Sequence, residues 1–158
     1  MKSRFRMVGV GGTFDELHKG HWALLMKAFE SGDKVWIGLS TDEFVEKIRK
    51  NHKIASYETR KKELMSFLEE NGLVGRAIIT PLRDSYGPAI HSKRLEAIVV
   101  SQETKPTVEK INTIRTQKGL PLLKVIVISM IPADNHIPIS TTRIRQGEID
   151  REGRMLIS

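Results

Sequence analysis

Five short apolar segments, separated by stretches with helical periodicity, constrain the fold of this chain most. These segments are Phe5 to Val10, Val35–Leu39, Ala77–Ile79, Ala97–Val100 and Leu122–Ser129. Their apolar character is largely continuous, which is typical of strands that are covered on both faces of a parallel sheet. The pattern therefore predicts an α/β fold: an open parallel sheet of about five strands with helices on both faces.

Four helices are expected between these strands. The first is predicted from Trp22, Leu25, Ala28 and Phe29, which recur at spacings of three and four residues. The others are predicted at Asp42 to about Lys50 after an N-cap at Thr41, at Tyr57–Asn71 closed by Gly72, and at Lys105–Lys118 between a Thr104 cap and Gly119. A break is expected at Ser31–Asp33, and an irregular functional loop at Pro81–Arg94. The 158 residues suit one domain, 1–158, in which 151–158 form a possible tail.

The stretch Gly11–His21, with the sequence GGTFDELHKGH, connects the first predicted strand to the first predicted helix. A glycine-rich turn that runs into a helix start favours anion binding, because the backbone can approach a ligand closely and unpaired amides point outward. His18 and His21 add two imidazoles, so the stretch predicts a site for a nucleotide phosphate. Two alternatives stay open: a histidine at a helix start is often only a cap, and a zinc pair is conceivable, although no further ligands cluster nearby.

Five polar segments directly follow predicted strands. They are residues 13–21, 40–41, 81–86, 101–102 and 133–142. Ligands of open parallel sheets bind beyond the carboxyl ends of the strands. We therefore expect these segments to share one edge of the sheet.

Two motifs resemble those of a known superfamily. The order G-T-F-D…H-x-G-H at Gly12–His21, together with I-S-T-T-R-I-R at Ile139–Arg145, is similar to the nucleotidyltransferase superfamily, in which the second motif reads I-S-S-T-x-x-R. Residues 81–89 and 95–101 are similar to archaeal and eukaryotic-type phosphopantetheine adenylyltransferases. The resemblance runs from about Phe5 to Ile149 and implies a Rossmann-like sheet.

The resemblance implies transfer of AMP from ATP to 4′-phosphopantetheine, giving dephospho-coenzyme A and pyrophosphate, with Mg²⁺ brought by ATP. An ionised phosphate acceptor needs no side-chain nucleophile or general base, so the protein has to align two anions and stabilise charge. The alternatives are a related cytidylyltransferase, or an adenylyltransferase with another phosphorylated acceptor. A non-catalytic module that binds RNA is a third reading, but the few aromatic residues are not interleaved with basic ones.

The resemblance also implies roles for individual residues. Thr13 matches the threonine at the acceptor phosphate and the transferring phosphorus, and His21 matches the histidine at the α-phosphate. The catalytic set is His21, Thr13, His18 and Lys53. The nucleotide-binding set is Gly12, Thr13, Phe14, His21, Ser140, Thr141, Thr142 and Arg143. The acceptor-binding set is Thr13, Lys50, Asp84 and Tyr86.

Some of these assignments leave alternatives. The lysine could be Lys47, Lys50 or Lys53, and Ser140 could simply cap a helix. Asp15 could orient its loop or help to hold Mg²⁺ through water, and no residue is assigned as a direct metal ligand.

One departure from the bacterial enzymes concerns charge. Ser101–Thr104 stands where those enzymes carry a pair of arginines, so the phosphate charge is expected to be met by Lys105, Arg115 or Arg143.

The amino-acid composition limits the class of protein and its partners further. The absence of cysteine excludes disulfides and thiolate chemistry, and no apolar run is long enough for a membrane span, so a cytoplasmic protein without a membrane partner is expected. The formal charge of +7 favours anionic partners, here ATP and 4′-phosphopantetheine rather than nucleic acid, and leaves the oligomeric state open. Charged runs such as Glu46–Lys50 and Arg60–Glu63 are interpreted as solvated helix faces.

Overall fold

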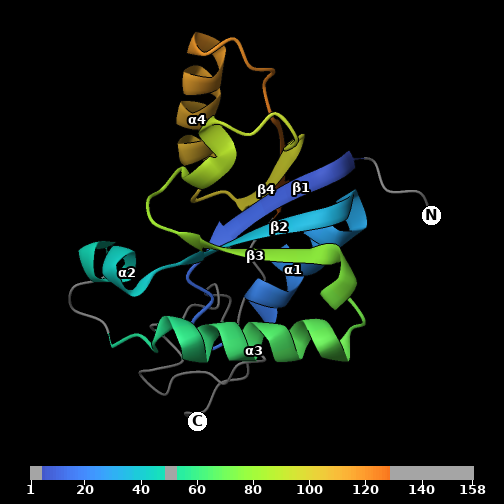
Figure 1. Ribbon diagram of the computed structural model, residues 1–158, viewed down its shortest axis with the longest axis vertical. Helices are drawn as coiled ribbons and strands as arrows, with labels where there is room; N and C mark the ends of the chain where they lie inside the picture. The colour runs from blue at the N-terminus through green and yellow to red at the C-terminus, as the bar shows by residue number, and fades with distance from the viewer. Residues whose placement is uncertain (1–4, 49–52, 129–158) are drawn as a thin grey trace.

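The computed structural model describes residues 5–48 and 53–128. Its core is one sheet of five strands in the order β3-β2-β1-β4-β5, and every neighbouring pair is parallel (Figure 1). The strands are β1 (Phe5–Gly12), β2 (Gly32–Ser40), β3 (Ala77–Leu82), β4 (Ala97–Ser101) and β5 (Lys124–Ile128). The helices are α1 (Lys19–Ser31), α2 (Asp42–Ile48), α3 (Tyr57–Glu70) and α4 (Lys105–Gln117), with short 3₁₀ helices η1 (Val74–Arg76) and η2 (Gly87–Ile90). The expected fold class is confirmed.

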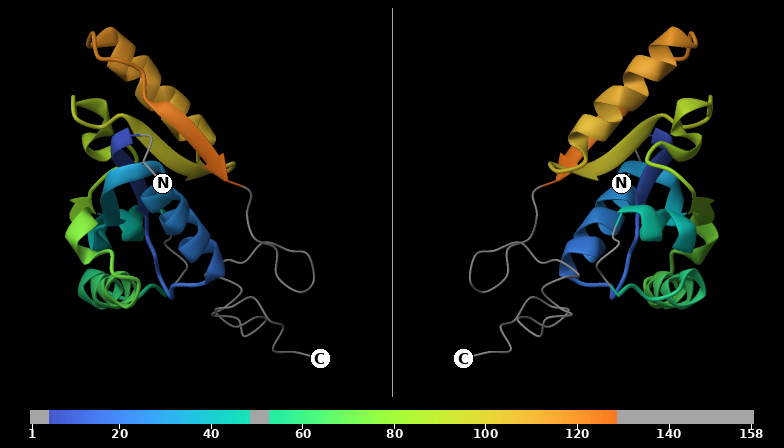
Figure 2. Two further views of the ribbon diagram at one scale, coloured as in Figure 1. Left: turned by 90° about the vertical axis from the view of Figure 1, so that its right-hand side faces the viewer. Right: turned by 90° about the vertical axis from the view of Figure 1, so that its left-hand side faces the viewer.

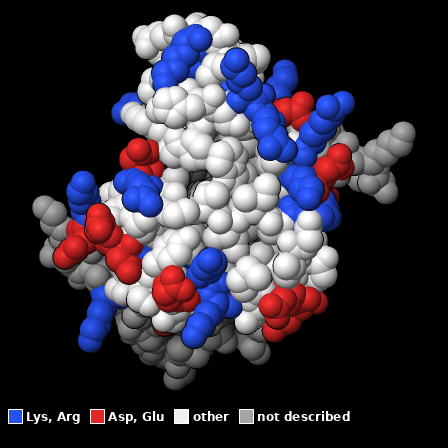
Figure 3. Space-filling model, in the orientation of Figure 1, with Lys and Arg blue, Asp and Glu red and all other residues white. Residues whose placement is uncertain are grey.

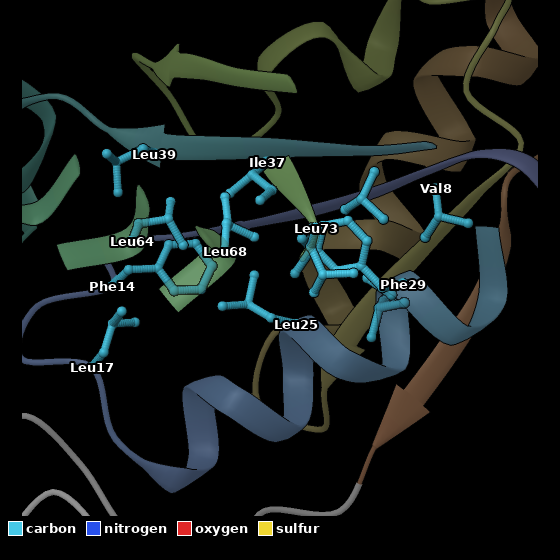
Figure 4. Packing of buried hydrophobic residues seen from close by; sticks show 14 of the residues in the cluster. Val8, Phe14, Leu17, Leu25, Phe29, Ile37, Leu39, Leu64, Leu68 and Leu73 are labelled. Carbon is cyan, nitrogen blue, oxygen red and sulfur yellow. The ribbon is translucent and has the colours of Figure 1, made fainter. Parts of the chain in front are cut away.

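Helices cover both faces of the sheet. Figures 1 and 2 show α1 and α3 on one side of it and α4 with η2 on the other. The larger core lies under α1 and α3, where Val8 of β1 and Ile37 of β2 pack with Leu25 and Leu68 (Figure 4). The opposite face carries a smaller cluster that includes Met7. Because successive side chains of a strand point to opposite faces, β1 contributes to both cores.

The strand order reverses at β1, which places the switch point of the sheet between β1 and β4. β1 pairs with β2 from Phe5↔Gly32 to Gly12↔Leu39, but its pairing with β4 ends at Gly9↔Ile98. The last three residues of β1 therefore extend beyond its pairing with β4. Open parallel sheets bind their ligands at this position, outside the carboxyl ends of the strands.

The predicted loop Pro81–Arg94 contains more regular structure than expected. Pro81 and Leu82 complete β3, where they pair with Leu39 and Ser40, and η2 forms farther along. The prediction took the whole segment as too polar and too rich in turn-forming residues for regular structure. It was wrong because β3 lies at the edge of the sheet, where a proline is tolerated.

The fifth strand begins later than predicted. Leu123 exchanges two hydrogen bonds with the side chain of Asn112 in α4: its N–H donates to Oδ1 (2.8 Å), and its carbonyl accepts from Nδ2 (3.1 Å). The backbone before Lys124 is therefore held by the helix and not by β4, and Leu122 is 61% exposed. Ser129, the predicted last residue, lies outside the described residues.

The predicted helix ends are mostly confirmed. Thr41 caps α2 through a bond from Phe44 N to its Oγ1 (3.1 Å), and Gly72 and Gly119 follow α3 and α4 with positive φ angles of 67° and 76°. Thr104 occupies the N-cap position of α4, but its hydroxyl bonds to the Ser101 backbone and does not cap the helix. The predicted continuation of α2 to Lys50 lies outside the described residues. Among the described helices, none is long and apolar enough to cross a membrane.

The expected break at Ser31–Asp33 is absent, because α1 ends at Ser31 and β2 begins at the next residue. Gly32 makes this direct connection possible. A Cβ atom at Gly32 would lie 2.5 Å from Val8 Cγ2 and 3.2 Å from the Lys34 carbonyl oxygen.

We expect Gly32→Ala to lower the free energy of unfolding by about 1–3 kcal/mol, because the added methyl group overpacks the contact with β1. Gly75→Ala is the matched control, since no atom lies within 4 Å of a Cβ placed there. Urea unfolding followed by circular dichroism measures both variants. Equal stability of the two would show that the contact at Gly32 relaxes without cost.

Candidate active site

The connection between β1 and α1, residues 13–18, is called the motif loop here. Gly11 and Gly12 belong to β1, so the turn begins at Thr13, two residues later than predicted. Phe14 and Glu16 have positive φ angles of 50° and 47°, which are unfavourable for residues that carry a side chain. The Phe14 ring is 1% exposed and points into the main core (Figure 4). Burial of this ring helps to hold the loop in its strained conformation.

The two histidines hold each other and the start of α1. His18 is the N-cap residue, and its Nδ1 accepts from Gly20 N (3.1 Å), while His21 Nδ1 accepts from His18 N (3.3 Å). The rings stack with centroids 3.8 Å apart, and Phe14 meets His21 edge-on at 5.4 Å. Since each Nδ1 accepts a hydrogen bond, each neutral ring carries its proton on Nε2. His18 thus has the capping role raised as an alternative.

Arg60 of α3 contacts the backbone of the motif loop. Its side chain is fully buried, and Nη1 donates to the carbonyl oxygens of Thr13 (3.0 Å) and Ser40 (2.7 Å). Nε donates to the Ala55 carbonyl (2.8 Å), and Nη2 pairs with Asp42 Oδ1 (3.0 Å). The interpretation of Arg60 as part of a solvated face was wrong. The guanidinium group is a structural centre that joins the ends of β1 and β2 to the start of α3.

Asp15 makes a second connection to the same region. Its carboxylate is buried, and Oδ1 accepts from Ala55 N (3.2 Å). This contact favours the loop-orienting role of Asp15 over a water-mediated role toward Mg²⁺. Lys53 is exposed and lies two residues before Ala55, so its segment is anchored to the motif loop.

Asp84 organises the segment that follows β3. Its Oδ1 accepts hydrogen bonds from Tyr86 N (2.9 Å) and Gly87 N (2.6 Å), an arrangement typical of an aspartate in a turn. Asp84 was predicted as an acceptor-binding residue, and the structure gives this oxygen a role in shaping the turn. Tyr86 is presented by that turn to a pocket described next.

A pocket lies on the α4 side of the sheet, and glycines form its floor. It is called the glycine-floored pocket, and its lining consists of Gly9, Val10, Gly11, Trp36, Gly38, Thr80, Leu82, Ser85, Tyr86, Pro88, Ala89, Leu95, Ile98 and Ile111. Gly11 and Gly38 are register partners in β1 and β2. Trp36 is oriented by a hydrogen bond from Nε1 to Thr80 Oγ1 (2.7 Å). Sequence reasoning missed this pocket, although glycine at alternate positions of β1 was a visible signal.

Charges on the face drawn in Figure 3 are of both signs and surround a broad area that lacks Lys, Arg, Asp and Glu. Positive charge is therefore not gathered into a single patch on this face. Such a distribution gives no support to the reading as a module that binds nucleic acid through a basic surface.

Arg115 does not face a ligand, and the expectation that it meets phosphate charge was wrong. It is 1% exposed and donates to the carbonyl oxygens of Pro121 (2.8 Å), Ala89 (2.7 Å) and Ser92 (2.8 Å). Burial lowers the pKa of the Arg115 guanidinium. The side chain supports the wall of the glycine-floored pocket at Ala89. Lys105, another candidate, is exposed in the first turn of α4.

The sequence model of the cytidylyltransferase-like family matches residues 10–147. The chain belongs to this family. It is 43% identical to the phosphopantetheine adenylyltransferase of Methanothermobacter thermautotrophicus, over 99% of this chain and 93% of that protein. It is 46% identical to the phosphopantetheine adenylyltransferase of Pyrococcus horikoshii, over 95% and 94% of the two chains. Within the family, the chain therefore groups with the archaeal phosphopantetheine adenylyltransferases.

A solved structure supports the fold. The crystal structure of a protein of unknown function from Archaeoglobus fulgidus is similar with a TM-score of 0.70 and 25% identity, over 77% of this chain and 88% of that one.

Four of the five expected polar segments lie at the carboxyl ends of β1 to β4, as predicted, although those at β2, β3 and β4 begin within the last residues of the strand. The fifth, residues 133–142, lies outside the described residues, as do Lys50, Ser140, Thr141, Thr142 and Arg143. Within residues 5–48 and 53–128, no group of three or more His, Asp or Glu side chains is arranged to hold a metal ion. The assignments of Gly12, Thr13, Phe14, His18, His21, Lys53, Asp84 and Tyr86 stay predictions, now with a defined geometry.

Proposed function

We propose that this protein transfers AMP from ATP to 4′-phosphopantetheine, forming dephospho-coenzyme A and pyrophosphate. The observation that carries this proposal is the match, over nearly the full length of both chains, to archaeal proteins named phosphopantetheine adenylyltransferase. The motif loop at the switch point of the sheet also supports it, because that position suits a nucleotide.

In this reaction an oxygen of the acceptor phosphate attacks the α-phosphorus of ATP. The bond from that phosphorus to the bridging oxygen breaks, and pyrophosphate leaves with the electron pair. A phosphate monoester has a second pKa of about 6, so its oxygens are largely ionised near neutral pH and no base is needed. Mg²⁺ enters with ATP as part of the substrate. The protein has to hold two anions in line and stabilise the charge that moves onto the leaving group.

The motif loop and the first turn of α1 supply the donors for this task. The Nε2–H group of His21 is suited to an α-phosphate oxygen, and the Thr13 hydroxyl is suited to the acceptor phosphate. The backbone of Thr13 and the two imidazole rings are held before substrate arrives, because Thr13 O is bonded to Arg60 and the histidine Nδ1 atoms are bonded to backbone amides. Donors that are fixed in advance stabilise a transition state without reorganisation.

The glycine-floored pocket is proposed to receive the pantetheine arm. Gly11 lies in its floor, two residues before Thr13, so an arm that lies there would bring its phosphate toward the motif loop. Trp36 and Tyr86 provide apolar walls for the carbon chain of the arm. Lys53, or one of the alternatives Lys47 and Lys50, would approach the acceptor phosphate from the segment anchored at Ala55.

The proposed reaction is tested by incubating the purified protein with ATP, 4′-phosphopantetheine and Mg²⁺, measuring pyrophosphate and identifying the product by mass spectrometry. A parallel panel replaces ATP by CTP and the acceptor by glycerol 3-phosphate. Formation of dephospho-coenzyme A is expected. Turnover with CTP and glycerol 3-phosphate, together with none of the proposed pair, would reject this function in favour of a cytidylyltransferase.

We expect His21→Ala to lower kcat by about 100-fold or more, because the lost donor acts on charge that develops in the transition state. Circular dichroism and thermal melting show whether the variant folds. His91→Ala is the matched control, since His91 is exposed and contacts Lys118 at the far end of α4. Near-normal kcat of His21→Ala would remove His21 from the catalytic set.

Substitutions at Gly38 test the pocket. A Cβ atom there would lie 3.3 Å from Leu82 Cδ1, so Gly38→Ala and Gly38→Val fill the floor progressively. We expect Gly38→Val to raise the KM for 4′-phosphopantetheine by about 10-fold or more, with a smaller rise for Gly38→Ala, because each removes space for the arm. The KM for ATP serves as the internal control. An equal rise in both KM values would place the arm elsewhere.

A further inference from the structure

In the part of the chain that the structure describes, three arginines bind backbone carbonyl groups from distant segments. Arg60 and Arg115 are described above, and Arg76 donates from Nε to the Asp33 carbonyl (2.9 Å) and from Nη2 to those of Phe29 (2.6 Å) and Gly32 (2.7 Å). Arg76 lies at the amino end of β2, whereas Arg60 lies at the carboxyl ends of β1 and β2. Of the three, Arg60 alone binds a residue of the motif loop.

The hydrogen bonds of Arg60 fix the direction of two peptide groups. In a trans peptide the C=O and the following N–H point in opposite directions. Because Thr13 O faces Arg60 Nη1, the N–H of Phe14 is turned away from the guanidinium group. The Ser40 carbonyl is held in the same way, and the following amide, Thr41 N, bonds to the carbonyl of Leu82 at the end of β3 (3.0 Å). One side chain thus orients the backbone at the ends of three neighbouring strands.

The groups around Arg60 compensate its buried charge. A buried charge needs a partner and saturated hydrogen bonds, and Arg60 has three carbonyls and the Asp42 carboxylate. Asp42 reaches it from the solvent side, with a side chain that is 61% exposed. Since Arg60 itself is fully buried, it acts on a ligand only through the groups that it holds.

We infer that Arg60 is a positioning residue for the transfer reaction: it sets the position of Thr13 relative to the segment anchored at Ala55, and so aligns the two substrates. This inference rests on the proposed function. The planar guanidinium group reaches the three carbonyls with two of its nitrogens, and a lysine ammonium group cannot reproduce that arrangement. Lysine at this position keeps the charge and loses the geometry.

The experiment compares Arg60→Lys with Arg76→Lys. The second variant also disturbs three backbone carbonyls, but at the amino end of β2. Melting temperature, kcat and both KM values are measured well below the melting temperature of either variant. Both variants are expected to melt earlier. Arg60→Lys alone is expected to lose kcat, by about 10-fold to 100-fold, because a displacement of about 1 Å costs that much in an aligned reaction.

A structural role alone would leave the two variants with similar kcat. The inference is therefore overturned if the kcat of Arg60→Lys lies within about twofold of that of Arg76→Lys, a difference too small for a misaligned reaction. Wild-type turnover of ATP with 4′-phosphopantetheine is measured in the same series. Absence of that turnover counts against the proposed function, whereas normal turnover of Arg60→Lys counts against this inference alone.

If Arg60→Lys does not fold, a second pair of variants tests whether Arg60 is a positioning residue. Asp42→Ala removes the anionic partner of Arg60 at an exposed position, and Glu43→Ala removes the neighbouring acid in the first turn of α2. We expect kcat of Asp42→Ala to be at least about twofold below that of Glu43→Ala, because the guanidinium group is less firmly held. Equal kcat values would overturn the inference.

Discussion

Backbone carbonyls at the carboxyl edge of this sheet must find donors other than a neighbouring strand, because a buried carbonyl without a partner is costly. Arg60 meets this requirement for Thr13 and Ser40 at once. It also binds Ala55, so the start of α3 is fixed relative to the ends of β1 and β2. The placement of the motif loop, and hence of His18 and His21 at the start of α1, depends on this set of hydrogen bonds.

The two faces of β1 show how one strand both packs a core and leaves room for a ligand. Val8 and Val10 face α1 and α3 in the main core, whereas Gly9 and Gly11 face α4. A Cβ atom at Gly9 would lie 3.1 Å from Leu95 Cδ1, and one at Gly11 would lie 3.3 Å from Leu82 Cδ2. A single methyl group at either glycine would therefore take up space in the glycine-floored pocket. The carboxyl-terminal half of β1 therefore packs the main core with one face and leaves the space of the glycine-floored pocket on the other.

The fold could be predicted because its strands are covered on both faces and read as apolar runs. Arg60 could have been suspected, since Leu64 and Leu68 follow at four and eight residues and mark the buried stripe of α3. In the same way, Arg115 continues the buried stripe of Val108 and Ile111 in α4. Their partners could not be predicted. The carbonyls of Thr13 and Ala89 lie 47 and 26 positions away, and no local pattern reports such a contact.

The motif loop itself has a strained backbone conformation. A residue other than glycine in the left-handed region costs about 1–2 kcal/mol, and the loop holds two such residues, Phe14 and Glu16. Glycine at position 14 would remove strain, but it would also remove the ring that fills the core and meets His21 edge-on. The ring also lies against Gly12, where a Cβ atom would be 3.3 Å from Phe14 Cε2. The surrounding structure therefore maintains the strain, and the conformation of the motif loop is set by the protein's own contacts.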